Sequence, residues 1–271
     1  MAERWPDFVI VGTMRSGTTS LYRHLADHPE VDPAVTKEIR YFTKHFELGD
    51  DWYRSQFPGR AGRITGEATP SYMHDRSAVD RMAAAIPDAK LIAILRHPAE
   101  RAWSHYLMRR SLGQEPRSFA AALEEERNAP SGSRREFDDY LSPGQYAEQL
   151  EHISTHYPRD RLQVHLFDDL ARDPASVYDA TCEFLGIAAS VRPPHLDTRV
   201  NAHAQYRSVA LRRLAKRGPH WLRNAVGRIN ASHAPPAPLD RELRAELIEH
   251  FRPHNQRLAA RLGRDLSDWD V

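Results

Sequence analysis

Residues 8–25, FVIVGTMRSGTTSLYRHL, combine a short apolar run, a loop bounded by glycines and the start of a helical pattern. The apolar run ends at Gly12, a second glycine stands at Gly17, and Leu21 and Leu25 then fall on one helix face. Backbone N–H groups at a helix start are unpaired, and together with the helix dipole they favour an anion. This stretch therefore predicts a phosphate-binding loop between a buried strand and a helix.

The cation of this loop differs from that of ATP-binding loops. The two glycines keep the spacing of the Walker A pattern, but Thr18 stands where the lysine should be, and the cation is Arg15. The apolar run KLIAIL at 90–95 is followed by Arg96 and not by an acidic metal ligand, so the loop is poorly equipped for Mg-ATP. A phosphate ligand other than Mg-ATP is the better interpretation, and a fortuitous glycine turn is the alternative. The hydroxyl groups of the loop belong to Ser16, Thr18 and Thr19.

Arg96 suggests a second phosphate subsite. It is followed by a predicted helix over 98–112 that carries Arg101 and Ser104. An arginine at the carboxyl end of a strand, with a serine on the helix behind it, can hold a phosphate apart from the one in the loop. Two separated phosphate sites fit a nucleotide 3′,5′-bisphosphate. The alternative is that Arg96 forms a structural salt bridge.

Strand patterns alternate with helical patterns, which predicts an α/β fold with a parallel sheet covered on both faces. The chain of 271 residues is interpreted as one domain over 1–271. The polar, glycine- and proline-punctuated segment 129–143 is expected to be a surface loop. Strands are predicted at 8–12, 63–67, 90–95 and 161–167, and helices at 18–28, 77–86, 98–112, 144–157 and 239–262.

Composition narrows the class of protein. The 38 Lys+Arg nearly cancel the 37 Asp+Glu, so net charge does not indicate a nucleic-acid partner. A single cysteine, Cys182, excludes an internal disulfide, and no apolar run approaches the length of a membrane span. These features predict a soluble, cytoplasmic protein. The sequence does not indicate its oligomeric state.

One segment has an unusual charge pattern. Residues 198–239 contain no acidic residue but eight basic ones, which fall between 199 and 228. The segment is interpreted either as a solvated basic helix or as a wall that faces a polyanionic ligand or an anionic lipid surface.

Several stretches resemble motifs of the sulfotransferases that use 3′-phosphoadenosine 5′-phosphosulfate (PAPS), especially the heparan-sulfate type and its bacterial relatives. GTMRSGTTSL at 12–21 resembles the 5′-phosphosulfate loop of the family, and AKLIAILRHPAERAWSHY at 89–106 resembles its 3′-phosphate motif. KEIRYF at 37–42 is similar to the segment that carries the catalytic glutamate. The resemblance covers nearly the whole chain, with further matches at 51–58, 66–72, 144–150 and 262–269.

The resemblance implies a P-loop-like fold with a five-stranded parallel sheet. It also implies sulfuryl transfer from PAPS, without a required metal, to a hydroxyl or amine of a small-molecule, carbohydrate or glycolipid acceptor. Glu38 would be the catalytic base, and Arg15 would stabilise the departing 5′-phosphate. The implied donor-binding residues are Arg15, Ser16, Gly17, Thr18, Thr19, Arg96 and Ser104.

Three positions depart from the family pattern. Arg15 replaces a lysine, Ala68 stands where many heparan-type enzymes have a lysine, and Arg40 replaces a residue that is often histidine. Because these departures surround the expected acceptor site, the acceptor of the family cannot be carried over. The alternatives are a small-molecule kinase that uses a degenerate P-loop, and a non-catalytic nucleotide or glycan binding protein.

Histidines offer two further candidate sites. His74 is the rival to Glu38 as the base, because other sulfotransferases use a histidine. His152 and His156 have the i, i+4 spacing of a metal-binding pair, but no third ligand accompanies them in the sequence. The sequence therefore predicts no metal site.

Overall fold

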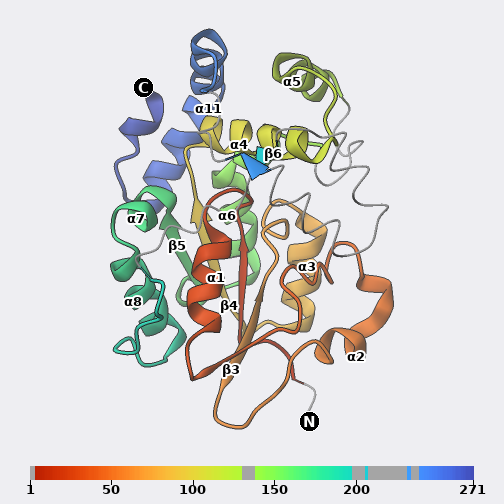
Figure 1. Cartoon of the computed structure of the whole chain (residues 1–271), viewed down its shortest axis with the longest axis vertical. Helices are drawn as coiled ribbons and strands as arrows, with labels where there is room; N and C mark the ends of the chain where they lie inside the picture. Colours follow the sequence, from red (N-terminus) through yellow and green to blue (C-terminus); the bar gives the residue numbers. More distant parts are fainter. Residues whose placement is uncertain (1–3, 130–137, 197–204, 207–230, 233–237) are drawn as a thin grey trace.

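The chain forms a five-stranded parallel sheet with helices on both faces, as Figure 1 shows. The computed structural model describes residues 4–129, 138–196, 205–206, 231–232 and 238–271. The strand order is β2-β3-β1-β4-β5, and each neighbouring pair is parallel. This confirms the predicted P-loop-like α/β fold. The strands are β1 (Phe8–Gly12), β2 (Val31–Pro33), β3 (Ile64–Ala68), β4 (Lys90–Leu95) and β5 (Leu162–Leu166).

Helices cover the two faces of the sheet and its carboxyl edge. The helices are α1 (Thr18–Ala26), α2 (Gly49–Arg54), α3 (Arg76–Ala85), α4 (Pro98–Leu112), α5 (Phe119–Asn128), α6 (Tyr146–His156), α7 (Phe167–Arg172), α8 (Pro174–Leu185) and α11 (Arg241–Leu262). Single 3-10 turns are η1 (Phe46–Leu48), η2 (Ser142–Gly144), η3 (Arg159–Arg161) and η4 (Ser267–Asp270). A separate two-stranded sheet pairs β6 (Gln205–Tyr206) with β7 (Ala231–Ser232).

Alternate side chains of β1 point to opposite faces of the sheet, as the two-residue period of a strand requires. Val9 and Val11 belong to a core with residues of α3, α6 and α11. Phe8 and Ile10 belong to a second core with residues of α1, α7 and α8. Because both faces are buried, the strand is apolar at every position and reads as a continuous run.

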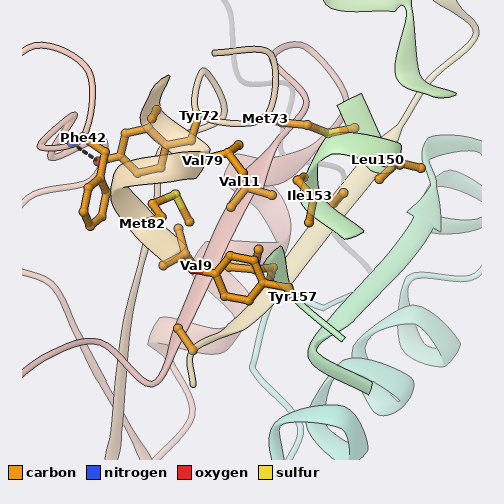
Figure 2. Close-up of a cluster of buried hydrophobic side chains, with 14 of the residues drawn as sticks. Val9, Val11, Phe42, Tyr72, Met73, Val79, Met82, Leu150, Ile153 and Tyr157 are labelled. Atoms are coloured by element: carbon orange, nitrogen blue, oxygen red, sulfur yellow. Dashed lines mark hydrogen bonds between the residues drawn. The ribbon is translucent and has the colours of Figure 1, made fainter. Parts of the chain in front are cut away.

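Figure 2 shows the first of these cores. Val9 and Val11 lie between side chains of α3, among them Met82, and side chains of α6, among them Ile153. The helix predicted over 144–157 is therefore present as α6, and it buries one face in this core. Tyr157, which follows α6, closes this core and donates a hydrogen bond from its hydroxyl to the carbonyl oxygen of Ile86 at 3.2 Å.

A third core lies over the carboxyl ends of the strands. In Figure 1, α4 crosses this end of the sheet, with α5 and part of α11 beside it. Ala102 of α4, Phe119 of α5 and Phe251 of α11 are buried together there. α4 therefore places polar side chains, such as that of Ser104, over the ends of β1 and β4.

Most predicted elements are confirmed, and their ends have local causes. α4 matches its predicted bounds, since Pro98 occupies the first turn and Gly113 ends the helix with φ 70°. α11 begins at Arg241 and not at 239, because the carboxylate of Asp240 caps it by accepting from two backbone N–H groups. The predicted strand 161–167 ends earlier, because Phe167 opens α7.

The sequence patterns miss β2, α2, α5, α7 and α8. β2 is only three residues long, and α2 and α7 are too short to show a helical period. α8 has ordinary start signals in Asp173 and Pro174 that could have revealed it. Residues 130–137 of the predicted loop lie outside the described residues, as does the segment 198–239 apart from β6, β7 and residues 238–239. None of the helices in the described part of the chain combines the length and apolar character that a bilayer span requires.

Candidate active site

The loop after β1 opens at the carboxyl edge of the sheet and leads into α1. Gly17 takes the N-cap position with φ 88°, and a Cβ there would lie 2.8 Å from a side-chain carbon of Leu170. The left-handed backbone conformation therefore favours glycine here, and a larger residue would also force the Leu170 side chain to shift. Thr13 ties the loop to β4, because its N–H donates to the carbonyl oxygen of Ile94 at 2.9 Å and its hydroxyl lies 2.6 Å from the hydroxyl of Ser16.

The start of α1 can receive an anion. No side-chain hydrogen bond caps the helix, although the N–H of Ser20 already donates to the carbonyl oxygen of Gly17 at 2.9 Å. The N–H groups of Thr18 and Thr19 are the ones that a helix start leaves for an anion. Ser16 and Thr18 are buried in the loop, and Thr19 is partly exposed. The loop residues expected to bind a phosphate thus surround one uncapped helix end.

Arg15, Ser104 and Arg96 meet above this helix end. The Nε of Arg15 donates to the hydroxyl of Ser104 at 3.0 Å, and Nη1 of Arg96 donates to the carbonyl oxygen of Arg15 at 3.2 Å. The guanidinium of Arg96 also lies 4.8 Å from the ring centre of Phe167. The sequence indicated two separated phosphate subsites, whereas the structure brings Arg15 and Ser104 into direct contact. A ligand that binds both side chains would replace the hydrogen bond between Arg15 and Ser104 with hydrogen bonds to the ligand.

A third guanidinium joins this cluster. Arg101 is completely buried in α4 and donates to the backbone carbonyl of Tyr140. Burial, followed by the charges of Arg96 and Arg101, lowers the pKa of Arg15 to about 10. Burial likewise lowers the pKa of Arg96 and of Arg101. Cations that are desolvated and repel one another favour binding of a multiply charged anion.

Sequence reasoning noted Arg101 on the predicted helix but assigned it no role. Ser104 and Arg101 are three residues apart and therefore share a helix face. That spacing was the available signal, but only tertiary contacts show that this face points inward. The hydroxyl of Tyr146 adds a further link, because it donates to the carbonyl oxygen of Arg96 at 2.8 Å and fixes the end of β4.

Glu38 lies on the other side of the loop from Arg96. Its N–H donates to the carbonyl oxygen of Ala68 at 3.1 Å, at the end of β3, which neighbours β1 on the side opposite β4. The carboxylate is 49% exposed and accepts from Lys37 Nζ at 2.7 Å. Arg15, Glu38 and Arg40 have φ values of 75°, 62° and 57°, a left-handed conformation that is uncommon outside glycine and often found at functional sites.

Glu67, a buried carboxylate in β3, holds the segment around Glu38. Its oxygens accept from the hydroxyls of Tyr53 at 2.7 Å, Thr69 at 2.6 Å and Tyr72 at 3.1 Å. The hydroxyl of Thr69 in turn accepts from the N–H of Arg40 at 3.2 Å. Burial raises the pKa of Glu67, although these hydrogen bonds oppose the shift. Sequence reasoning gave Glu67 no role, although a carboxylate in a short apolar strand was a usable signal.

His74, the rival base, is also at this edge. The N–H of Met73 donates to the carbonyl oxygen of Val11 at 2.9 Å, which places His74 beside the end of β1. Burial, followed by the charges of three arginines, lowers the pKa of His105, and His74 is close enough to make a smaller contribution in the same direction. Ala68, where the related enzymes often have lysine, is completely buried in the core that contains residues of α1, α7 and α8.

The prediction about His152 and His156 was wrong in one respect. The sequence pattern suggested no third ligand, but Asp80 of α3 lies against both imidazoles on α6. Asp80 is 72 residues from His152 in the chain, so only the packing of α3 on α6 brings them together. This cluster lies between α3 and α6, and it is apart from the loop after β1 and from Glu38.

Comparisons with known proteins identify a family. A family model described as "Sulfotransferase domain" matches residues 5–210. Human bifunctional heparan sulfate N-deacetylase/N-sulfotransferase 3 is 29% identical over 284 residues, which cover 98% of this chain and 31% of that protein. Human heparan sulfate glucosamine 3-O-sulfotransferase 3B1 is 30% identical over 270 residues, with coverage of 99% and 66%. The chain thus spans about a third of the bifunctional relatives it matches.

Solved structures show the same relationship. A sulfotransferase from Alicyclobacillus acidocaldarius superimposes with a TM-score of 0.76 at 28% identity, covering 99% of this chain and all of that one. The sulfotransferase domain from the curacin biosynthetic pathway, at 16% identity and a TM-score of 0.50, shares the fold.

Proposed function

The chain belongs to the sulfotransferase family, and from this premise we propose that it transfers a sulfuryl group from PAPS to a carbohydrate acceptor. The observation that carries the proposal is the meeting of Arg15, Arg96 and Ser104 over the uncapped start of α1. The helix start suits a 5′-phosphate, and Arg96 with Ser104 suits a 3′-phosphate.

The residues of the site match the charge of this donor. A 3′,5′-bisphosphate would neutralise the guanidinium groups whose pKa values burial has lowered, so its binding removes an existing repulsion. Binding of Mg-ATP would favour a carboxylate at the end of β4 as a ligand of the magnesium ion, but Arg96 stands there. The comparisons give no support to the kinase alternative.

The proposed reaction asks the protein for positioning and charge stabilisation. The acceptor oxygen or nitrogen forms a bond to sulfur while the bond from sulfur to the 5′-phosphate oxygen breaks. Arg15 and the N–H groups at the start of α1 stabilise the charge that grows on this phosphate. Glu38, on the far side of the loop, accepts the proton that the acceptor loses. His74 is the second candidate for that proton.

The acceptor class is inferred from relatives. The names of the human relatives include both an N-sulfotransferase and a 3-O-sulfotransferase of heparan sulfate, so amine and hydroxyl acceptors on a sugar both fit. Arg40 differs from the expected family pattern and is two residues from Glu38, so it would help to shape an acceptor site of this chain's own. Ala68 is buried in the core and lacks the lysine of many related enzymes. A cytoplasmic location is part of the proposal, and it rests on the single cysteine, Cys182, which is free and buried.

The experiment is a turnover assay with PAPS labelled at sulfur, a panel of glycan, phenol and lipid acceptors, and a parallel series in EDTA. We expect transfer to carbohydrates and unchanged turnover in EDTA, because no carboxylate ends β4. Loss of activity on chelation, with recovery in Mg²⁺ and consumption of ATP, would contradict the proposal. Tight binding of the bisphosphate without transfer to any acceptor would instead favour a non-catalytic binding protein.

A further inference from the structure

We propose that Asp80, His152 and His156 bind a divalent transition-metal ion that clamps α3 to α6. This site is separate from the donor site and is not needed for sulfuryl transfer. Among residues 4–129, 138–196, 205–206, 231–232 and 238–271, these three form the group whose histidine nitrogens and carboxylate oxygen converge, with all three ligand atoms within 4.8 Å of one another.

The geometry of the cluster is that of a preformed ligand set. The Nε2 atoms of His152 and His156 each lie 2.9 Å from the same Oδ1 of Asp80. The two imidazole rings are nearly perpendicular, at 86°, with centres 5.3 Å apart, so their nitrogens approach the carboxylate from different directions. The i, i+4 spacing on α6 places both rings on one helix face, and α3 supplies the opposing carboxylate.

An ion fits between these atoms with little movement. Metal–nitrogen and metal–oxygen bonds to zinc are roughly 2.0–2.2 Å long. Two ligand atoms 2.9 Å apart would then subtend roughly 90° at the ion, and a modest separation of the helices would reach the tetrahedral angle. A set of two imidazoles and one carboxylate suits zinc, nickel or copper and leaves positions for water.

Solvent can reach the cluster. The side chains of Asp80, His152 and His156 are 54%, 16% and 34% exposed, so an ion can enter without unfolding. One neighbour opposes binding: Nη1 of Arg76 lies 3.5 Å from Nδ1 of His152. Arg76 is exposed, and its contact is at the outer limit of a hydrogen bond, so the guanidinium can turn away.

The clamp would act on the packing of the domain. α3 and α6 both contribute to the core on the face of the sheet that contains Val9 and Val11, and they contact each other there. An ion shared by the two helices binds only the folded chain, and therefore stabilises it. His156 is the last residue of α6, which leads through η3 into the start of β5, so the site is displaced towards the amino edge of the sheet.

The test uses metal-stripped full-length protein and Zn²⁺ alone. Calorimetry should give one ion per chain for the wild type, and the melting temperature should rise by roughly 5 °C at a hundredfold excess over Kd. His152→Gln/His156→Gln and Asp80→Asn should each lose this ion and the rise in melting temperature. The matched control is His250→Gln/His254→Gln, another i, i+4 histidine pair with a nearby carboxylate, that of Glu148, and it should keep both.

A second variant sharpens the result. Arg76→Ala removes the opposing cation, so its affinity for Zn²⁺ should be higher than that of the wild type. Absence of a bound ion in the wild type, or equal binding by the wild type and the Asp80 variant, would overturn the proposal. Turnover should not change in EDTA or in the Asp80 variant, and its loss in both would contradict the separation of this site from catalysis.

Discussion

Glu38 and Glu67 are two carboxylates on adjoining segments whose surroundings differ. Glu38 is half exposed and paired with Lys37, whereas Glu67 is completely buried and receives three hydroxyl donors. A solvated carboxylate can meet an acceptor, and a buried, fully hydrogen-bonded one is suited to holding the backbone in place. We therefore assign proton transfer to the first and positioning to the second.

The assignment of Glu38 predicts the behaviour of Glu38→Gln. The amide keeps the shape of the side chain but removes its basicity, so turnover should fall by about 10²–10⁴-fold. Affinity for the bisphosphate product should stay within twofold, because Glu38 lies on the side of the loop away from Arg96. Turnover and calorimetry on the same purified variant check this. Near-normal turnover would show that Glu38 is not the catalytic base. His74 would then be the candidate, and His74→Gln would test it.

The positioning role of Glu67 predicts a different pattern. Glu67→Ala leaves the hydroxyls of Tyr53, Thr69 and Tyr72 without their acceptor and frees the segment that carries Glu38. Turnover should fall roughly 10–100-fold through misplacement of the base, with little change in bisphosphate affinity. Glu67→Gln, which keeps one oxygen acceptor, should recover most of the turnover. Wild-type turnover in Glu67→Ala would show that the network does not position the base.

At the scale of elements, β5 and α8 are joined by a buried histidine. Nε2 of His165 lies 3.0 Å from the hydroxyl of Thr181, and that hydroxyl donates to the carbonyl oxygen of Val177. Nε2 must therefore carry a proton and donate it. Burial is the main cause that lowers the pKa of His165 to about 4, so the ring is neutral in the folded chain at physiological pH.

This pKa predicts a loss of stability in acid. The unfolded chain takes up the proton near pH 6.5, whereas folded His165 takes it up near pH 4, so the free energy of unfolding falls as pH drops between these values. The loss attributable to His165 is about 3 kcal/mol at most, and it should level off below pH 4. Urea unfolding from pH 7 to 4 should show a shallower pH dependence for His165→Gln. Parallel curves for the two proteins would contradict the assignment.

Elements differ in how far the sequence predicts them. The bounds of β1, β4 and α4 follow from the pattern. β1 and β4 are continuous apolar runs, and α4 begins and ends at proline and glycine signals. β2 is missed because three residues carry no period, and its place at the sheet edge depends on pairing with β3. α8 was missed although Asp173 and Pro174 mark its start, so an available signal was not used there.

The candidate site follows from the sequence to the extent that its residues lie at the ends of recognisable elements. Arg15, Arg96 and Ser104 were predicted as donor-binding candidates, because a loop, a strand end and a helix face can be aligned from sequence alone. Arg101, Glu67 and Asp80 were not, because their roles arise from contacts between segments far apart in the chain. Direct contact between Arg15 and Ser104 likewise required the packing of α4 over β1.

At the scale of the whole molecule, the sheet order separates the two halves of the proposed reaction. β3 brings Glu38 to one side of β1, and β4 brings Arg96 and the start of α4 to the other. The loop after β1 lies between them, where strand connections change direction and where α/β folds bind ligands. An acceptor entering from the side of β3 would thus meet the sulfuryl group opposite its leaving phosphate.

The most direct test of this arrangement is calorimetric affinity for 3′-phosphoadenosine 5′-phosphate compared with adenosine 5′-phosphate. Each charge-assisted contact to the 3′-phosphate contributes about 1.5–3 kcal/mol, so the bisphosphate should bind at least tenfold more tightly. Ser104→Ala should reduce this preference without changing affinity for the monophosphate by more than a few fold. Equal affinity of the wild type for the two nucleotides would contradict the account.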